Sequence, residues 1–103
     1  MGYTLRMQVQ ITEVYRDWIH ALRDRTIRAR IQVRVDRLVH GNPGQYRVLS
    51  DGVCELKIDV GPGYRVYYTR RGKTLIMLLI GGAKRTQKRD IKRALEMMKQ
   101  LEG

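Results

Sequence analysis

The chain has a single cysteine, Cys54, among its 103 residues, and only 10 acidic residues stand against 21 lysines and arginines. One cysteine excludes an internal disulfide and any cysteine-rich metal site, and it fits a reducing compartment. Histidine, cysteine and carboxylate residues do not cluster at the spacing of metal ligands. The sequence therefore predicts neither a metal nor another cofactor.

Long hydrophobic runs are also missing. The longest, from Leu75 to Ile80, is far too short to cross a bilayer, and no stretch combines a basic start, an apolar run and a cleavage site. We therefore expect a soluble, cytoplasmic protein with no membrane partner. The length suits one domain with its own core, so residues 1–103 are expected to form a single domain.

The shortage of acidic residues leaves a formal net charge of +11. The excess positive charges repel one another in the folded state unless an anionic partner neutralises them. Nucleic acid is the obvious candidate for this partner. A basic surface by itself supports only salt-sensitive binding that is blind to sequence. The charge thus indicates a class of partner and no activity.

The first third of the chain predicts one strand and two helices. Residues 5–10 alternate apolar and polar side chains, with Leu5, Met7 and Val9 on the buried face, and Thr12 can cap a following helix. That helix carries Trp18, which its spacing makes a core anchor rather than a stacking platform. A break at Asp24 leads into a second helix that ends at residues 41–44, so the two helices should form a hairpin laid across a sheet.

Two alternating strands surround the turn Gly61-Pro62-Gly63. A three-residue turn would pair Val60 with Tyr64, which places an apolar row on one face of the strands. The opposite, exposed face would then carry a polar row: Glu55, Lys57, Arg65, Tyr67 and Thr69. The exposed row has the character of a site for a polyanion.

The last third predicts a central strand and a final helix. Residues 74–80 are apolar without alternation, which is typical of a strand covered on both faces, and Gly81-Gly82 should end it. Thr86 can cap a helix whose apolar stripe includes Met98. Together with short strands at residues 46–49 and 53–60, these elements predict an α+β fold: an N-terminal strand, a two-helix hairpin, a mostly antiparallel twisted sheet and a C-terminal helix.

If the partner is RNA, cleavage needs a group that deprotonates the 2′-hydroxyl, a cation that stabilises the pentavalent phosphorus, and a proton for the leaving oxygen. His20 and His40 lie away from the basic strand pair and are expected to be incidental. The remaining catalytic candidates are Lys57, Arg65, Lys84 and Arg85. Around them, the candidates for substrate binding are Glu55, Tyr67, Arg70, Lys88 and Arg89. The alternative for such a run of charges is an ordinary solvated surface.

The run Glu55-Leu56-Lys57-Ile58, the segment from Gly61 to Tyr68, the segment from Gly81 to Gln87 and Arg89-Asp90-Ile91 together resemble the RelE/ParE toxin superfamily, and most closely its HigB-like branch of phage-related addiction-module killer proteins. The resemblance extends over nearly the whole chain. It implies a RelE-like domain from a bacterial toxin-antitoxin system, in which many members cut messenger RNA on the ribosome.

Carried over by this resemblance, the strand lysine of the family falls on Lys57, its strand arginine on Arg65, and the basic pair after the last strand on Lys84 and Arg85. Two positions depart from the pattern. Glu55 replaces a second lysine found in some relatives, and Ile91 replaces a tyrosine that some carry in the last helix. Base stacking on that tyrosine is therefore not expected here, although Tyr67 on the exposed strand face is a possible substitute.

The resemblance leaves alternatives open. The first is a ribosome-dependent endoribonuclease that needs no metal, with Lys57 or Lys84 handling protons. The second is a non-enzymatic toxin like the ParE branch, which binds DNA gyrase, and the third is a plain nucleic-acid-binding module. Either toxin implies a hetero-oligomer with a cognate antitoxin from a neighbouring gene, which should cover the basic face or wrap the sheet edge.

Overall fold

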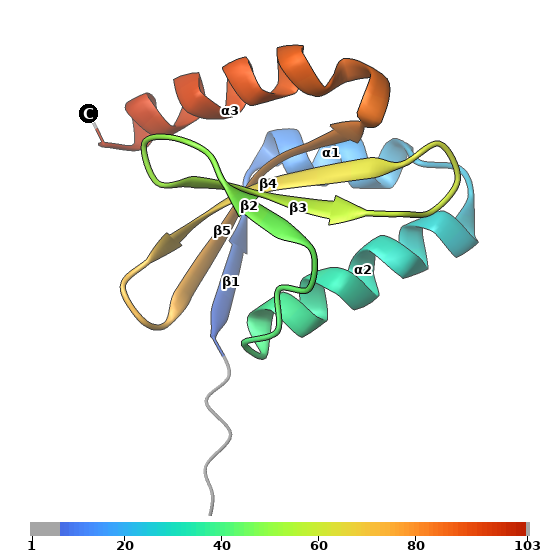
Figure 1. Ribbon diagram of the computed structural model, residues 1–103, viewed down its shortest axis with the longest axis horizontal. Coiled ribbons are helices and arrows are strands. Elements are labelled where there is room, and N and C mark those ends of the chain that lie inside the picture. Colours follow the sequence, from blue (N-terminus) through green and yellow to red (C-terminus); the bar gives the residue numbers. More distant parts are fainter. Residues whose placement is uncertain (1–6, 103) are drawn as a thin grey trace, which may run out of the picture.

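The computed structural model describes residues 7–102 and begins with an edge strand. This strand, β1 (Gln8–Ile11), runs parallel to β5 (Leu75–Ala83) (Figure 1). Part of the predicted first strand is therefore present, whereas its Leu5 lies outside the described residues. Met7 is buried as predicted. The predicted burial of Val9 is wrong, because this side chain lies on the edge strand and is 42% exposed.

Two helices follow β1. The first begins at the cap predicted at Thr12, and the second begins at the predicted break, where Asp24 is the cap. α1 (Glu13–Ala21) starts after Thr12, whose hydroxyl accepts a hydrogen bond from the Tyr15 N–H at 3.0 Å. α2 (Arg25–Val39) starts after Asp24, whose carboxylate accepts from the Thr26 N–H at 2.9 Å. Both helices pack on the same face of the sheet. Their buried side chains are Tyr15, Ile19, Ile31, Val35, Leu38 and Val39.

The remaining strands are β2 (Tyr46–Val48), β3 (Val53–Ile58) and β4 (Tyr64–Arg71), and the strand order is β1-β5-β4-β3-β2. Every pairing except that of β1 with β5 is antiparallel, which confirms the predicted α+β fold with a mostly antiparallel sheet. β2 and β3 are joined by a tight turn in which Asp51 and Gly52 both have positive φ.

The register of β3 and β4 differs from the prediction by two residues. The structure pairs Ile58 with Tyr64, and not Val60 with Tyr64, so residues 59–63 form a longer connection. A shift of two leaves every side chain on its predicted face, since strands alternate with period two. It does change the neighbours: Lys57 now lies directly opposite Arg65, and Glu55 opposite Tyr67.

Gly81-Gly82 does not end β5, contrary to the prediction. The strand continues to Ala83, with Gly81 opposite Val66 and Gly82 opposite Arg65. An added Cβ at Gly81 would overlap the Trp18 ring of α1, and one at Gly82 would overlap a carboxylate on the opposite face of the sheet. The two glycines are therefore needed because groups from both layers press against the strand.

After a 3₁₀ turn (Lys84–Thr86), α3 (Gln87–Glu102) crosses the face of the sheet opposite to α1 and α2 (Figure 1). It packs with Ala94 and Met98 buried against Val53, Tyr67 and Leu79. The prediction that this face of β3 and β4 is exposed is thus wrong over most of its length. Among the helices in residues 7–102, none combines the length and apolar character needed to cross a bilayer.

Candidate functional site

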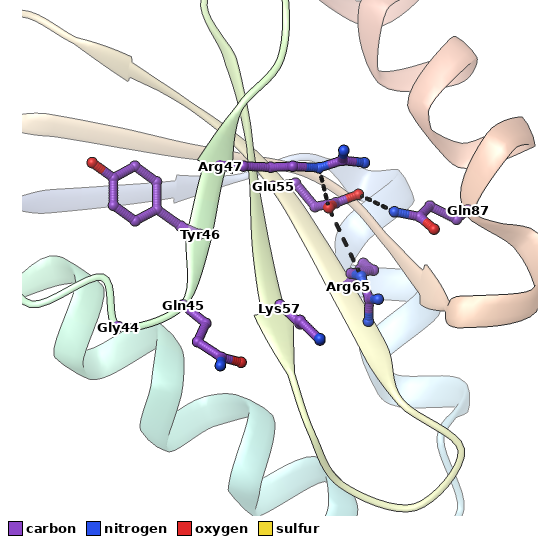
Figure 2. Close-up of a pocket in the computed structure, with 8 residues that line it drawn as sticks. All are labelled: Gly44, Gln45, Tyr46, Arg47, Glu55, Lys57, Arg65 and Gln87. Carbon is purple, nitrogen blue, oxygen red and sulfur yellow. Dashed lines mark hydrogen bonds and ion pairs between the residues drawn. The ribbon is translucent and has the colours of Figure 1, made fainter.

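An open hollow of about 570 Å³ lies over β2, β3 and β4, next to the start of α3 (Figure 2). Strand alternation directs Glu55, Lys57 and Arg65 to the same side of the sheet. The eight residues that line the hollow are Gly44, Gln45, Tyr46, Arg47, Glu55, Lys57, Arg65 and Gln87. α3 covers only part of this face, so the Lys57 end stays open while the Tyr67 end is buried.

Glu55 is the centre of the polar contacts in the hollow. Its Oε1 accepts a hydrogen bond from Arg47 Nε at 2.8 Å, and its Oε2 accepts one from Gln87 Nε2 at 2.9 Å. Arg65 Nε lies 3.8 Å from the same Oε1. The carboxylate therefore ties together β2, β3, β4 and α3 (Figure 2).

The electrostatics of Glu55 favour its charged form. Burial alone raises the pKa of this carboxyl, because only 4% of the residue is exposed. The hydrogen bonds from Arg47 and Gln87 and the positive charge of Arg47 outweigh burial, so the pKa of Glu55 lies below its ordinary value. Glu55 is thus an ionised group with both oxygens occupied, which suits it to orient arginines rather than to donate a proton.

Besides Arg47, which is hydrogen-bonded to Glu55, the hollow has two cations, Arg65 and Lys57. Arg65 is 6% exposed, and its Nη1 donates to the Tyr64 carbonyl oxygen at 3.2 Å, while its buried Nε has no hydrogen-bond partner among the described residues. Lys57 lies directly opposite on β3 and is exposed. One buried guanidinium and one exposed ammonium group thus share a single concave surface, which is an arrangement suited to phosphate.

The basic pair after β5 lies beside this hollow and does not line it. A Cβ added at Gly63 would lie 3.6 Å from Lys84 Cβ and 3.8 Å from Arg65 Nη1, so Lys84 and Arg65 both lie close to Gly63. Arg85 lines a second hollow, formed by residues 84–89, which shares Gln87 with the first. The structure thus brings Lys57 and Arg65 together, sets Lys84 near Arg65 and leaves Arg85 on an adjoining surface.

The candidates for substrate binding divide in the same way. Lys88 and Arg89 line the second hollow, whereas Arg70 is exposed on β4 and lines neither. Tyr67 is fully buried beneath α3, so the prediction that it lies on an exposed face and can stack on a base is wrong. Burial and the neighbouring Glu55 carboxylate also raise the pKa of Tyr67, whose hydroxyl is buried.

Sequence reasoning missed several residues of the hollow, chiefly Arg47 and Gln87. Arg47 pairs directly with Glu55 across β2 and β3, and the Asp51-Gly52 turn signal could have revealed this pairing. Gln87 carries no comparable signal, because it reaches Glu55 only through the packing of α3. Within residues 7–102, no three histidine, cysteine or carboxylate side chains are grouped so that they could hold a metal ion.

A further arginine, on the opposite face of the sheet, binds the backbone at the edge of the hollow. Arg34 of α2 donates from Nη1 to the Lys57 carbonyl oxygen at 2.6 Å, and from Nη2 to those of Pro43 at 2.8 Å and Gln45 at 3.3 Å. The Lys57 N–H in turn donates to the Gln45 carbonyl oxygen at 3.0 Å. Arg34 thereby fixes the backbone that carries Lys57.

Comparison with known proteins assigns this arrangement to a family. Residues 17–99, which include the whole hollow, match the family described as phage-derived protein Gp49-like (DUF891). The chain belongs to the Gp49-like family. This family is of the RelE/HigB toxin type, which agrees with the resemblance in the sequence.

An uncharacterized protein of Haemophilus influenzae is also similar to this Gp49-like chain. The two are 38% identical over 97 residues, which cover 94% of this chain and 98% of the relative. The likeness therefore spans β1 and the hollow as well as the helices, but the relative's name adds no activity.

Proposed function

We propose that this Gp49-like protein is a toxin that cleaves messenger RNA on the ribosome without a metal ion. The proposal rests on one observation above all: Lys57 and Arg65 lie opposite each other in an open hollow whose only acidic side chain is already paired. A phosphodiester can approach these cations without meeting a free carboxylate. The membership in a RelE/HigB-type family supports the same class of function.

The residues of the hollow have distinct proposed roles. The Arg65 guanidinium stabilises the negative charge that builds on the phosphate oxygens in the transition state. Lys57, the exposed ammonium group, or the neighbouring Lys84 moves the protons of the reaction. Glu55, Arg47 and Gln87 are positioning residues, because they contact Arg65 or one another.

The test is to express the protein with and without its neighbouring gene and to map RNA ends after induction. We expect cuts within translated messages at fixed positions relative to the ribosome. Arg65→Ala should lower cleavage by at least about 100-fold, the effect typical of losing one group that stabilises transition-state charge. Arg30→Ala is the matched control, because Arg30 is exposed on α2, which packs on the opposite face of the sheet.

Two results would overturn the proposal. One is full cleavage by a folded Arg65→Ala protein, with folding checked by circular dichroism. The other is growth arrest with intact transcripts and double-strand DNA breaks, which is the behaviour of a gyrase-directed toxin. Absence of any growth arrest would support only a plain nucleic-acid-binding module.

A cognate antitoxin is part of the same proposal. β2 is an edge strand of the sheet, and its side chains Tyr46 and Val48 are 50% and 67% exposed. An unpaired strand edge with exposed apolar side chains can accept a strand or helix from a partner. Tyr46 also lines the hollow, so a partner bound to β2 would block access to Lys57 and Arg65.

A further inference from the structure

A third hollow lies on the other side of the segment that joins β5 to α3. It has a volume of about 410 Å³ and is lined by both aromatic and charged side chains. Trp18 of α1 and Tyr64 of β4 form the aromatic part, with ring centroids 6.3 Å apart and planes tilted by 56°. Arg85 and Arg89 line the same hollow from the start of α3.

The three hollows adjoin one another on the surface. The first and second share Gln87, and the second and third share Arg85, Thr86 and Arg89. A chain of anionic groups that starts at Lys57 and Arg65 can therefore follow the row of cations at residues 84–89 and reach Trp18. The second and third hollows both include Arg85 and Thr86, which lie in the 3₁₀ turn between the end of β5 and the start of α3.

The third hollow differs chemically from the first. The first offers cations and a paired carboxylate, whereas the third offers the partly exposed ring of Trp18 together with the guanidinium groups of Arg85 and Arg89. The third hollow also contains a buried carboxylate, Asp90, which is paired as well: its Oδ2 accepts a hydrogen bond from the Thr86 hydroxyl at 2.6 Å, and its Oδ1 lies 3.7 Å from Arg89 Nε. Aromatic rings and guanidinium planes stack on nucleobases, and cationic grooves follow the backbone of single-stranded nucleic acids. An apolar protein segment would gain little from the two arginines.

We infer that the hollow formed by Trp18, Tyr64, Arg85 and Arg89 is a subsite that stacks one base of single-stranded RNA flanking the phosphate held at Lys57 and Arg65. This inference deepens the proposed function and rests on it for the identity of the RNA as substrate. Arg85 and Arg89 hold the backbone between the two hollows, and Trp18 contacts the base. Trp18 is thus assigned a binding role in addition to its packing against Gly81.

Trp18 is the only tryptophan in the chain, so its fluorescence reports directly on this subsite. The probes are 2′-O-methyl oligoribonucleotides, which cannot be cleaved through the 2′-oxygen, in a series of lengths from the dinucleotide upward. We expect the shortest probes to leave the fluorescence unchanged and longer ones to quench it once they reach from Lys57 to Trp18. Oligomers of equal length with abasic sites should bind without quenching, because they supply phosphates but no base.

A substitution at Arg89 distinguishes a specific contact with the RNA backbone from a general attraction of the RNA to a basic protein. Arg89→Gln should weaken binding of the long probes and lower the slope of log affinity against log salt by about 0.7, the value for one lost contact with a single strand. Lys73→Gln removes the same charge in the turn between β4 and β5 and should leave the slope unchanged. The dinucleotide should bind both variants equally.

The inference is overturned if long probes bind with no change in Trp18 fluorescence, if abasic probes quench as strongly as intact ones, or if an acidic peptide quenches and RNA does not. Failure of the proposed function gives a different result. In that case induced cells contain uncut messages, whatever the fluorescence shows. Ribosome-phased cleavage without base-dependent quenching would contradict the stacking subsite but support the proposed nuclease activity.

Discussion

Arg34 Nη1 lies 2.6 Å from the carbonyl oxygen of Lys57, so a helix on one face of the sheet holds the strand residue that faces the hollow on the other. Burial lowers the pKa of Arg34, although the group stays protonated at any physiological pH. This contact makes α2 part of the support of the candidate site.

Arg34→Met should therefore destabilise the protein. The methionine can fill part of the space, but it leaves the carbonyl oxygens of Pro43 and Lys57 without their donor, at a cost of about 1–3 kcal/mol in the free energy of unfolding. Urea denaturation measures this change. Arg30→Met is the matched control, because Arg30 is exposed on the same helix and should cost less than about 0.5 kcal/mol. Equal effects of the two substitutions would contradict a supporting role for Arg34.

The lowered pKa of Glu55 predicts how stability depends on pH. A group whose pKa is depressed by folding stabilises the native state above its ordinary pKa, near 4.5, and loses that contribution as the pH falls through its lower, folded value. The free energy of unfolding of the wild type should thus exceed that of Glu55→Gln by a constant amount at neutral pH. The difference should shrink as the pH drops below about 4.5.

Urea titrations of both proteins at several pH values test this expectation. Glu96→Gln is a suitable control, since Glu96 is exposed on α3. A difference between wild type and Glu55→Gln that grows on acidification would show that burial, and not the contacts with Arg47 and Gln87, controls Glu55.

Much of the fold could be predicted because its signals are local. The caps at Thr12 and Asp24 and the tight turn at Asp51-Gly52 are set by side chains and φ angles within a few residues. The faces of β3 and β4 were also predictable, even though the register is shifted by two, because period-two alternation is insensitive to that shift.

The errors share one cause, which is packing between distant segments. Gly81-Gly82 resembles a strand end in sequence, yet Trp18 and α3 press on the two faces of a strand that continues. The polar row on β3 and β4 resembles an exposed surface until α3 covers Tyr67. In the candidate site, the strand pair brings Lys57 and Arg65 together, whereas Gln87 reaches Glu55 only after α3 has docked.

Trp18 and Gly81 should behave as a coupled pair. Gly81→Ala forces its new methyl group into the Trp18 ring, so it should destabilise the protein by about 1–3 kcal/mol, the usual cost of overpacking. Trp18→Leu alone should also destabilise, because it removes packing against Tyr15 and Tyr64. The double variant should cost less than the sum of the two, because the smaller side chain makes room for the methyl group.

A double-mutant cycle by thermal or urea denaturation measures this coupling. Additive effects within about 0.5 kcal/mol would mean that the two residues do not interact. Such a result would also weaken the assignment of Trp18 to a fixed position beside the third hollow.

Lys57 and Lys84 differ in their relation to Arg65, and this difference predicts which one matters more for cleavage. Lys57 lines the same hollow as Arg65 and lies directly opposite it, whereas Lys84 lines the adjoining hollow. Lys57→Met should therefore reduce the single-turnover rate of ribosome-bound message cleavage by about 100-fold or more, and Lys84→Met by a smaller factor. If Lys57 moves a proton, its loss should also flatten the dependence of the rate on pH, whereas loss of a lysine that only attracts phosphate should lower the rate equally at every pH. If both proteins are folded and Lys84→Met causes the larger loss, the proton-transfer role belongs to Lys84. The scissile phosphate would then lie closer to the second hollow than to the first.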